Sequence, residues 1–294
     1  MKIYVPATTT NFGSGFDTFG LALELFNVFE VKKSNSFKVE IKGEGKNLPK
    51  NENNLVIKVY KKTCETCGVY PQPFEIYQFN RIPTSRGLGS SATAIVGGIE
   101  IACRLHNLKL SLKDKLKIAS LFESHFDNLI PAFVGGFVIC IQNKDIYFER
   151  IKFPEDIRLV FVVPDFELST ESARGVLKKS VSLQDAVFNI QRASLMVYSL
   201  LRGNYPLLRE AVKDKLHQPL RANLIPGFYK VLEAGYSAGA YAVFLSGAGP
   251  TIGALVSPEF SDKVGKAMNK AFSSEGISSR IFKLKASEKG AFSE

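Results

Sequence analysis

The stretch RIPTSRGLGSSATA at residues 81–94 joins an expected strand to an expected helix and is rich in small residues. Gly87 and Gly89 can adopt positive φ without a Cβ penalty, and they let backbone N–H groups approach a bound group closely. Ser90 and Ser91 stand where the N-cap of the helix is expected. Unpaired N–H groups and the positive end of the helix dipole point the same way in such a loop, which predicts a phosphate site.

Two better-known phosphate loops do not fit this stretch. A Walker A loop ends in Gly-Lys-Ser/Thr, but no lysine lies between Arg86 and Lys109. The dinucleotide-binding fingerprint needs a third glycine, which Gly-Leu-Gly-Ser-Ser-Ala lacks. Taken by itself, the loop leaves a plain strand–turn–helix corner open as the alternative.

Length and composition predict a globular enzyme of two domains or one large one. The chain has 294 residues, of which 45% are hydrophobic and 22% charged. It contains no run of about 18 apolar residues, and Met1 leads directly into an expected strand, so we expect neither a membrane span nor a signal peptide. A cytoplasmic location is the default expectation.

The net charge of +10 allows two interpretations, a lysine-rich surface or a nucleic-acid binder. The basic residues are spread along the chain, most densely at 109–117, and no RNA-binding or zinc-finger motif accompanies them. We therefore expect no nucleic-acid partner, although a positive field would attract an anionic nucleotide. The four cysteines and three histidines have no zinc-site spacing, so they predict reduced thiols and no metal centre of their own.

The order of expected elements predicts an α+β protein, because strands are paired as hairpins as often as they are separated by helices. Strands are expected at 2–6, 37–41, 74–79, 132–140, 145–151, 158–163, 241–246, 252–256 and 279–284. Helices are expected at 54–67, 91–104, 111–124, 182–201, 205–216, 226–235 and 258–272. The pattern changes at 153–156, which we take as the domain boundary. The second half then resembles a ferredoxin-like sandwich.

Four polar clusters recur at expected turns, at residues 11–17, 83–93, 123–128 and 246–251. In the first of them, Asn11 and Asp17 flank two glycines and are able to point into a shared pocket. Both are also ordinary turn residues, and without further context that interpretation is preferred.

The spacing of these clusters resembles the GHMP kinases, whose central signature is Pro-x-x-x-Gly-Leu-Gly-Ser-Ser-Ala. The matching positions are Pro83, Gly87, Leu88, Gly89, Ser90, Ser91 and Ala92. The opening at 7–20, the stretch ESHFDNLIPA at 123–132, SAR at 172–174, RANLIPGF at 221–228 and SGAGPT at 246–251 are most similar to the homoserine kinase branch. The resemblance therefore covers nearly the whole chain.

This resemblance implies a two-domain GHMP kinase fold. The N-terminal ATP-binding domain, of the ribosomal protein S5 domain 2 type, would span residues 1–153, and the ferredoxin-like C-terminal domain would span residues 154–294. The implied reaction is ATP-dependent phosphorylation of the L-homoserine hydroxyl on the route to threonine. The family also suggests a homodimer.

The same resemblance assigns roles to residues of this chain. The ATP phosphates would be bound by Pro83, Arg86, Gly87, Leu88, Gly89, Ser90, Ser91, Ala92 and Thr93, and the base would be touched by Asn54. Mg²⁺ would be held by Ser91 and Glu123. Homoserine would be bound by Asn11, Asp17, His125, Asn128, Arg174, Arg221, Gly247 and Gly249. Asp17 suits its ammonium group, and the two arginines suit its carboxylate.

The catalytic group of this assignment comprises His125, Asp127 and Asn128 at the hydroxyl end. Asn128 cannot act as a base, whereas Asp127 can, and the γ-phosphate itself can also accept the proton. Phosphoryl transfer depends mainly on positioning and charge stabilisation, so we favour direct in-line transfer without a strong base.

Some positions depart from the family pattern, among them Phe126 where proline is common and Ser124 where glycine is common. Neither change removes a charged contact. Two alternatives stay open, a GHMP kinase for mevalonate, shikimate or a sugar, and a non-catalytic ligand-binding protein of the same fold. The combination of Asp17 with Arg174 and Arg221 favours an amino-acid substrate, and the Ser91/Glu123 pair favours an enzyme.

Overall fold

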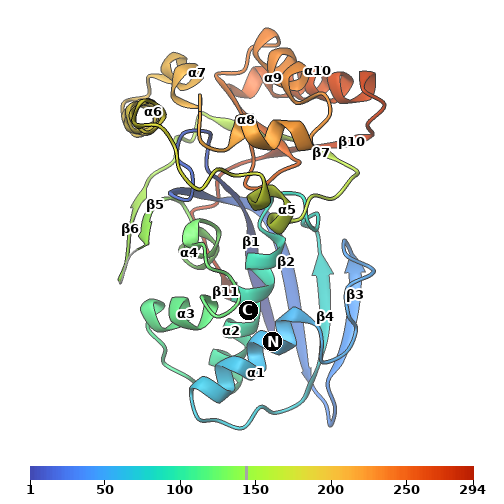
Figure 1. Ribbon diagram of the computed structural model, residues 1–294. Helices are drawn as coiled ribbons and strands as arrows, with labels where there is room; N and C mark the ends of the chain where they lie inside the picture. Colours follow the sequence, from blue (N-terminus) through green and yellow to red (C-terminus); the bar gives the residue numbers. More distant parts are fainter. Residues whose placement is uncertain (143–144) are drawn as a thin grey trace.

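Two β-sheets, one above the other in Figure 1, organise the chain. The computed structural model describes residues 1–142 and 145–294. The lower sheet is built mainly from the first half of the chain and the upper sheet from the second half. This arrangement confirms the predicted α+β class, with a change of sheet after residue 151.

The lower sheet contains seven of the described strands, in the order β11-β1-β2-β4-β3 with β5 and β6 extending from β2. Its strands are β1 (Lys2–Thr10), β2 (Phe19–Lys33), β3 (Lys38–Gly43), β4 (Phe74–Asn80), β5 (Phe137–Gln142), β6 (Ile146–Ile151) and β11 (Phe292–Ser293). β3 and β4 are parallel, and the other pairs are antiparallel. β4 has the alternation of a half-buried strand, since every second side chain is buried.

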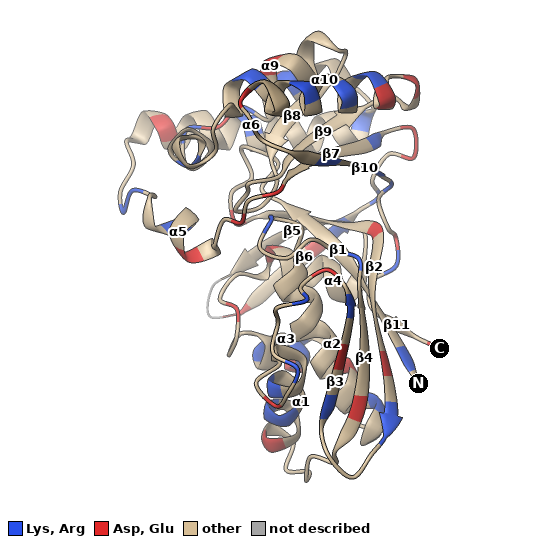
Figure 2. Ribbon diagram, turned by 90° about the vertical axis from the view of Figure 1, so that its right-hand side faces the viewer, with Lys and Arg blue, Asp and Glu red and all other residues tan. Residues whose placement is uncertain are grey.

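Four helices cover one face of this sheet and leave the other face open, as Figure 2 shows. They are α1 (Leu55–Thr66), α2 (Ser90–Leu105), α3 (Leu112–Ala119) and α4 (Phe126–Val134). Asn54 caps α1 by accepting a hydrogen bond from the Val56 N–H, and Ser111 caps α3 by accepting one from the Asp114 N–H. Both caps agree with the helix starts expected from the sequence.

The upper sheet has the order β10-β7-β9-β8 and is antiparallel throughout. Its strands are β7 (Arg158–Pro164), β8 (Ala242–Leu245), β9 (Ile252–Val256) and β10 (Ser279–Leu284). β7 lies in the interior of the sheet, as its continuous apolar run predicted. The helices α9 (Phe228–Ser237) and α10 (Ser261–Ser274) cover its outer face.

The remaining helices of the second half of the chain lie around the upper sheet or, like α5, between the two sheets (Figure 1). They are α5 (Thr170–Gly175), α6 (Leu183–Arg202), α7 (Leu208–Ala211), α8 (Gln218–Arg221) and three short 3₁₀ helices, η1 (Tyr205–Leu207), η2 (Ala222–Leu224) and η3 (Pro258–Phe260). The expected helix at 205–216 is therefore wrong. Pro206 lies in the first turn, and Asp214 accepts backbone N–H bonds that redirect the chain before α8.

A second expectation is wrong at residues 132–140, where one buried strand was predicted. Residues 132–134 are the end of α4, and the strand begins only at Phe137. Gly135 and Gly136 both have positive φ and make the turn between the two elements. An apolar run of this length does not distinguish a buried helix from a buried strand, which explains the error.

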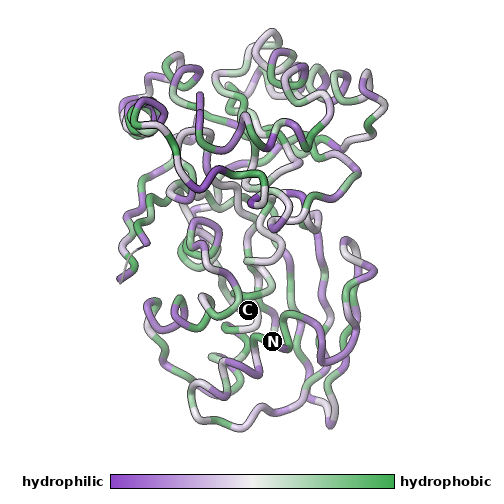
Figure 3. The backbone as a smooth tube through the Cα atoms, in the orientation of Figure 1, coloured by the Kyte–Doolittle hydropathy of each residue, from purple (hydrophilic) through white to green (hydrophobic). Residues whose placement is uncertain are grey.

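One apolar core lies between the two sheets and joins them. Phe12 stacks on Phe244 of the upper sheet, with ring centroids 4.7 Å apart, and Phe137 lies edge-on to Phe12. All three side chains are fully buried. Hydrophobic residues follow the strands and hydrophilic residues gather on the outer turns in Figure 3, as this packing requires. The shared core fixes the loops of both sheets against one another.

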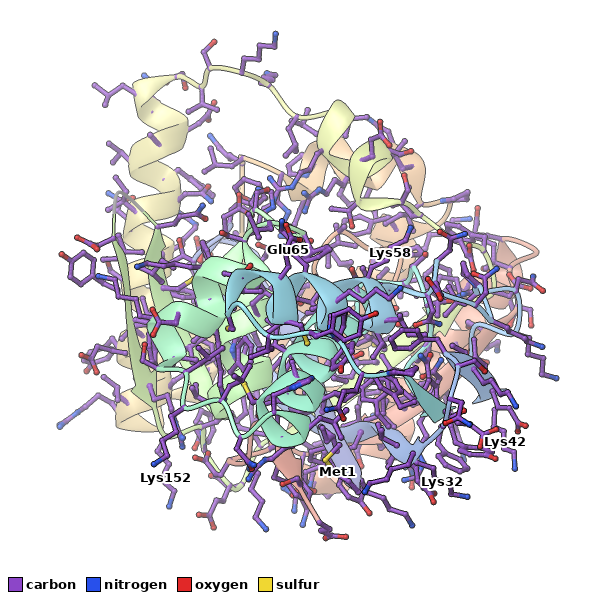
Figure 4. All side chains as sticks on the ribbon, turned by 90° about the horizontal axis from the view of Figure 1, so that it is seen from below. Met1, Lys32, Lys42, Lys58, Glu65 and Lys152 are labelled. Carbon is purple, nitrogen blue, oxygen red and sulfur yellow. The ribbon has the colours of Figure 1, made fainter. Side chains whose placement is uncertain are left out.

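The chain ends where it began, on the lower sheet. β11 pairs with β1, and the N–H of Lys2 donates to the carbonyl of Glu294 at 2.9 Å. The basic side chains labelled in Figure 4, Lys32, Lys42, Lys58 and Lys152, extend outward from separate parts of the surface. Among the described helices, none combines the length and the apolar character that a membrane span requires.

Candidate active site

A cavity of about 410 Å³ opens where the loops of the two sheets meet. Its walls contain most of the residues singled out in the sequence: Asn11, Asp17, Asn54, Arg86, Gly87, Gly89, Ser90, Ser91, Ala92, Glu123, His125, Asp127, Asn128, Arg174, Arg221, Gly247 and Gly249. They come from segments up to 238 residues apart, since Asn11 and Gly249 both line it. The fold therefore gathers all four polar clusters at one place.

Three predicted residues lie behind the wall. Leu88 is fully buried in the apolar core between the sheets, and Pro83 is buried next to the loop. Thr93 is fully buried as well, where its hydroxyl donates to the Ser90 carbonyl and accepts from Asn27 Nδ2. These three residues support the loop from behind. They do not line the cavity, so the structure does not place them where the predicted contact with a nucleotide would need them.

The glycine loop is held between β1 and the turn after β8. A Cβ on Gly89 would lie 1.9 Å from Thr8 Oγ1, and a Cβ on Gly87 would lie 2.2 Å from the Ser246 carbonyl oxygen. Both glycines have positive φ. Gly89 itself is the N-cap of α2, in the left-handed conformation and without a side-chain cap, so the predicted serine N-cap is wrong. The free N–H groups of the first turn of α2 are consequently left for a ligand.

Two predicted nucleotide contacts are already engaged with protein groups. The Arg86 guanidinium donates to the Pro164 carbonyl at 3.0 Å and to the Asp165 carbonyl at 2.5 Å, which ties the loop to the end of β7. The Asn54 amide accepts from Val56 N and Gln78 Nε2 and donates to the Pro49 carbonyl. Both residues line the cavity, but their polar groups stabilise its walls.

At the opposite end, Asp17 and Arg174 form a two-pronged ion pair. Arg174 Nη2 lies 2.7 Å from Asp17 Oδ1, and Nη1 lies 3.2 Å from Oδ2. Asp17 comes from the loop after β1, with φ +53°, and Arg174 comes from α5. The pair is about 30% exposed on each side, so a small charged molecule can reach both partners.

Arg221 lies beside this pair and is only 1% exposed. Its Nε donates to the Ala173 carbonyl at 3.1 Å and its Nη1 to the Gly247 carbonyl at 3.0 Å. Burial, with a further contribution from Arg174, lowers the pKa of Arg221 to about 10. The group remains cationic at neutral pH, and the cavity thus has two guanidinium groups and one carboxylate at this end.

Asp127 and Asn128 lie at the start of α4, between the two ends. Asp127 is 2% exposed, and burial together with the charge of Asp17 raises its pKa to about 6. Thr8 donates its hydroxyl to Asn128 Oδ1 at 2.7 Å. Because Oδ1 is already accepting, Asn128 presents Nδ2 as a hydrogen-bond donor.

Glu123 and His125 flank the glycine loop. His125 Nδ1 lies 2.9 Å from Glu123 Oε1, which also accepts from the His125 backbone N–H at 3.2 Å. Burial disfavours the Glu123 carboxylate, but the hydrogen bonds and charge of His125, with a contribution from Arg174, outweigh it and lower its pKa. Glu123 is therefore ionised at neutral pH, facing the same cavity as the Ser91 hydroxyl.

The cavity wall also contains polar residues that the sequence analysis missed. Asn27 and Gln78 project from β2 and β4, Thr10 is the last residue of β1, and Ser169 and Thr170 begin α5. Asn27 carried a detectable signal, since it is a single amide within the apolar run FGLALELFNVFEV. A polar side chain at a buried strand position needs a partner, and Asn27 Oδ1 accepts the N–H groups of Arg81 and Ile82.

Comparison with known proteins places this arrangement in a family. The model of the GHMP kinases N terminal domain matches residues 54–136, and that of the GHMP kinases C terminal domain matches residues 196–274. The chain is 55% identical over 292 residues to the homoserine kinase of Aquifex aeolicus, with 99% of this chain and 98% of that protein covered. The chain belongs to the homoserine kinase family of the GHMP kinases.

Two further homoserine kinases agree with this assignment. The homoserine kinase of Persephonella marina is 46% identical, with 99% of this chain and 97% of that protein covered. The crystal structure of homoserine kinase from Cytophaga hutchinsonii superposes with a TM-score of 0.88 at 31% identity, covering 99% of this chain and 96% of that one. These matches confirm the two-domain GHMP kinase fold and the homoserine kinase family predicted from the sequence motifs.

Proposed function

We propose that this protein transfers the γ-phosphoryl group of ATP to the side-chain hydroxyl of L-homoserine and releases O-phospho-L-homoserine. The observation that carries the proposal is the pairing of two different ends in one cavity. One end is a glycine loop at a helix N-terminus, suited to phosphates. The other end has one carboxylate and two guanidinium groups, suited to the ammonium and carboxylate of one amino acid.

In this proposal the Asp17–Arg174 pair opens around the substrate. The homoserine ammonium replaces Arg174 as the partner of Asp17, and the homoserine carboxylate becomes the partner of Arg174 and Arg221. The charges of the pair are thereby conserved, so little desolvation is left uncompensated. Asn11, Gly247 and Gly249 form the wall around the substrate, and His125 and Asn128 flank the hydroxyl end.

Mg²⁺ is the proposed cation partner of the nucleotide. The Ser91 hydroxyl and the ionised Glu123 carboxylate face the cavity at the glycine loop, and one carboxylate plus one hydroxyl is a donor set that suits this ion. When bound, Mg²⁺ neutralises phosphate charge. Among the described residues, no group of three or more His, Cys, Asp or Glu side chains forms a metal cluster, so phosphate oxygens and water would complete the coordination.

The proton of the substrate hydroxyl can leave without a strong protein base. Asp127 is the candidate carboxylate at the hydroxyl end. Its pKa, raised to about 6, makes it a stronger base than an ordinary carboxylate, but its Oδ1 already accepts the N–H of Asn128 at 3.0 Å. In the loose transition state of phosphoryl transfer the hydroxyl loses its proton late, so positioning matters more than basicity. We favour direct in-line transfer.

We also propose a homodimer formed through α6. Exposed apolar side chains follow one side of this helix at helical spacing: Leu183, Val187, Ile190, Tyr198 and Leu201. Figure 1 places α6 at the outer edge of the molecule, accessible to a second copy.

The division of the chain at residues 153–154 remains a proposal as well. β7 starts the upper sheet directly after that point, while β11 returns to the lower sheet. We further propose that the protein works in the cytoplasm in threonine biosynthesis, without a nucleic-acid or membrane partner.

A substrate panel tests the function. The purified protein is assayed for ADP release with ATP and Mg²⁺ on L-homoserine, mevalonate, shikimate and galactose. We expect turnover with L-homoserine at a kcat/KM at least about 100-fold above the other three. Turnover only on a substrate without an ammonium group would reject the proposal, and ATP binding without turnover on any of them would favour a non-catalytic role.

A further inference from the structure

Behind Arg221, outside the cavity wall, lies a network of buried polar side chains that the proposed reaction does not use. Asp214 and His217 are its centre, and both side chains are completely inaccessible to solvent. Asn189 of α6 and Gln218 of α8 are also buried there. A buried group of this size carries a desolvation cost unless each member is satisfied, so each contact has a structural consequence.

Asp214 fixes the start of α8. Its Oδ1 accepts from Asn189 Nδ2 at 2.7 Å and from the Leu216 N–H at 2.8 Å, while Oδ2 accepts from the N–H groups of His217 and Gln218 at 2.9 and 2.6 Å. Four hydrogen bonds on one carboxylate hold the turn rigid. This turn therefore fixes the backbone positions of His217 and Arg221.

The contacts of His217 define which ring nitrogen carries the proton. Nε2 lies 2.8 Å from the Gly13 carbonyl oxygen and 3.5 Å from Asp214 Oδ2, and both are acceptors. Nδ1 lies 3.3 Å from Arg221 Nη1, which is a donor. Nε2 must therefore carry the proton and Nδ1 must accept. Burial lowers the pKa of His217 and outweighs the raising effect of the Asp214 carboxylate, and Arg221 lowers the pKa further, which agrees with a neutral ring.

His217 Nδ1 is one of three acceptors that hold the Arg221 guanidinium in place. The guanidinium also donates through Nη1 to the Gly247 carbonyl and through Nε to the Ala173 carbonyl. The ring of Phe16 stacks on His217 with centroids 4.9 Å apart and lies 5.3 Å from the guanidinium carbon. Among the described residues these contacts use Nε and Nη1, so Nη2 is the nitrogen that remains for a ligand in the cavity.

We propose that His217 is a positioning residue for substrate binding: as a neutral Nε2–H imidazole it couples the loop at Gly13 to Arg221 and aims Nη2 at the substrate carboxylate. This inference rests on the proposed function, because it takes Arg221 as the carboxylate partner of L-homoserine. It predicts that His217 acts on the amino-acid end of the cavity alone and leaves the nucleotide end unchanged.

Two substitutions separate the two hydrogen bonds of the ring. His217→Asn keeps an oxygen near the position of Nδ1, so it still accepts from Arg221 but loses Gly13. His217→Gln keeps an N–H near the position of Nε2, so it still donates to Gly13 but leaves Arg221 without this acceptor. We expect KM for L-homoserine to rise about tenfold in His217→Gln and less than about threefold in His217→Asn, with KM for ATP unchanged in both.

A double-mutant cycle and a structural measurement complete the test. In an Arg221→Lys background, His217→Gln should add less than about twofold to KM, because the group it positions is absent. The protein has three histidines. In ¹⁵N NMR spectra of the full-length protein with labelled histidine, the ring signals that are absent from the His217→Gln variant belong to His217. We expect a protonated Nε2 and an unprotonated Nδ1 at neutral pH.

Several results would overturn the inference. A proton on Nδ1 would remove its basis regardless of the substrate. Equal KM changes in the Asn and Gln variants, a parallel rise in KM for ATP, or additive effects with Arg221→Lys would assign His217 a purely structural role. If the wild-type protein does not turn over L-homoserine, the proposed function fails by itself, and the NMR result still decides the arrangement of His217 and Arg221.

Discussion

The two ends of the cavity are built in opposite ways. The proposed nucleotide end is one continuous segment, residues 81–94, whose backbone N–H groups and glycines would bind the phosphates. The proposed amino-acid end consists of side chains from distant segments, with Asp17 in the loop between β1 and β2, Arg174 in α5 and Arg221 in α8. Substitutions at the first end should therefore impair activity by distorting the backbone. Substitutions at the second end should impair it by removing single charged groups.

The largest effect is expected from Gly89→Ala. The added Cβ would meet Thr8 Oγ1 at 1.9 Å in a residue with φ +72°, which would displace the loop from β1. We expect kcat/KM for ATP to fall at least about 100-fold, because displacements near 1 Å have such costs in active sites. Steady-state kinetics with varied ATP measure it.

Gly68→Ala is the matched control for that prediction. Gly68 has φ +68°, and a Cβ there would have no neighbour within 4 Å. It carries the same backbone strain, on the order of 1 kcal/mol, but no clash and no place in the cavity. Equal activity losses in the two alanine variants would mean that strain alone matters, and that the loop geometry does not.

Arg221→Lys should have the next largest effect, confined to the other end. A lysine keeps the charge but not the planar fork that reaches two carbonyls and a carboxylate together. We expect KM for L-homoserine to rise about 30-fold, with KM for ATP within about twofold of wild type. Arg209→Lys, on the exposed side of α7, serves as control. A shared rise in both KM values would contradict the separation of the two ends.

Asp127→Asn tests the region where the ends meet. If transfer is direct, kcat should stay within about tenfold of wild type, whereas a loss beyond about 10³-fold would make Asp127 the base. Burial and Asp17 raise the Asp127 pKa to about 6, so the native state binds this proton more tightly than the unfolded state does. The stability that this proton confers is complete below the unfolded pKa of about 4 and is lost as pH rises through about 6.

The same variant therefore has a stability signature. Asparagine is neutral at every pH, so Asp127→Asn should match wild type near pH 4 and exceed it above pH 6 by up to roughly 3 kcal/mol, from two pKa units. Denaturant unfolding at the two pH values measures the difference. A variant that is less stable than wild type at pH 7 would contradict the raised pKa.

The smallest effect on turnover is expected far from both ends, on α6. Ile190 is 64% exposed, and Ile190→Glu should convert the proposed dimer to a monomer while kcat changes less than about twofold. The neighbouring exposed Gln191→Glu introduces the same charge and should leave the dimer intact. Light scattering after size-exclusion chromatography gives the mass of each, and a wild-type monomer would reject the interface.

Local patterns in the sequence identified most of the secondary structure. The alternation in β4, the apolar run of β7 and the caps of α1 and α3 depend on neighbours within a few residues, so they can be recognised without the fold. The ends of apolar segments were less clear. α4 continues through residues that fit a strand equally well, and only the positive φ of Gly135 and Gly136 divides helix from strand.

The sequence by itself predicted the nucleotide end, because a phosphate loop consists of consecutive residues whose small size and turn geometry are local properties. It also named the charged residues of the other end, but only through a family pattern. The tertiary structure decided that Asp17 pairs with Arg174, that Arg86 and Asn54 serve the walls, and that His217 accepts from Arg221. Most of these pairings join residues far apart in the chain, whereas His217 and Arg221 are four residues apart. Their distances follow from packing between the two sheets, which no local pattern contains.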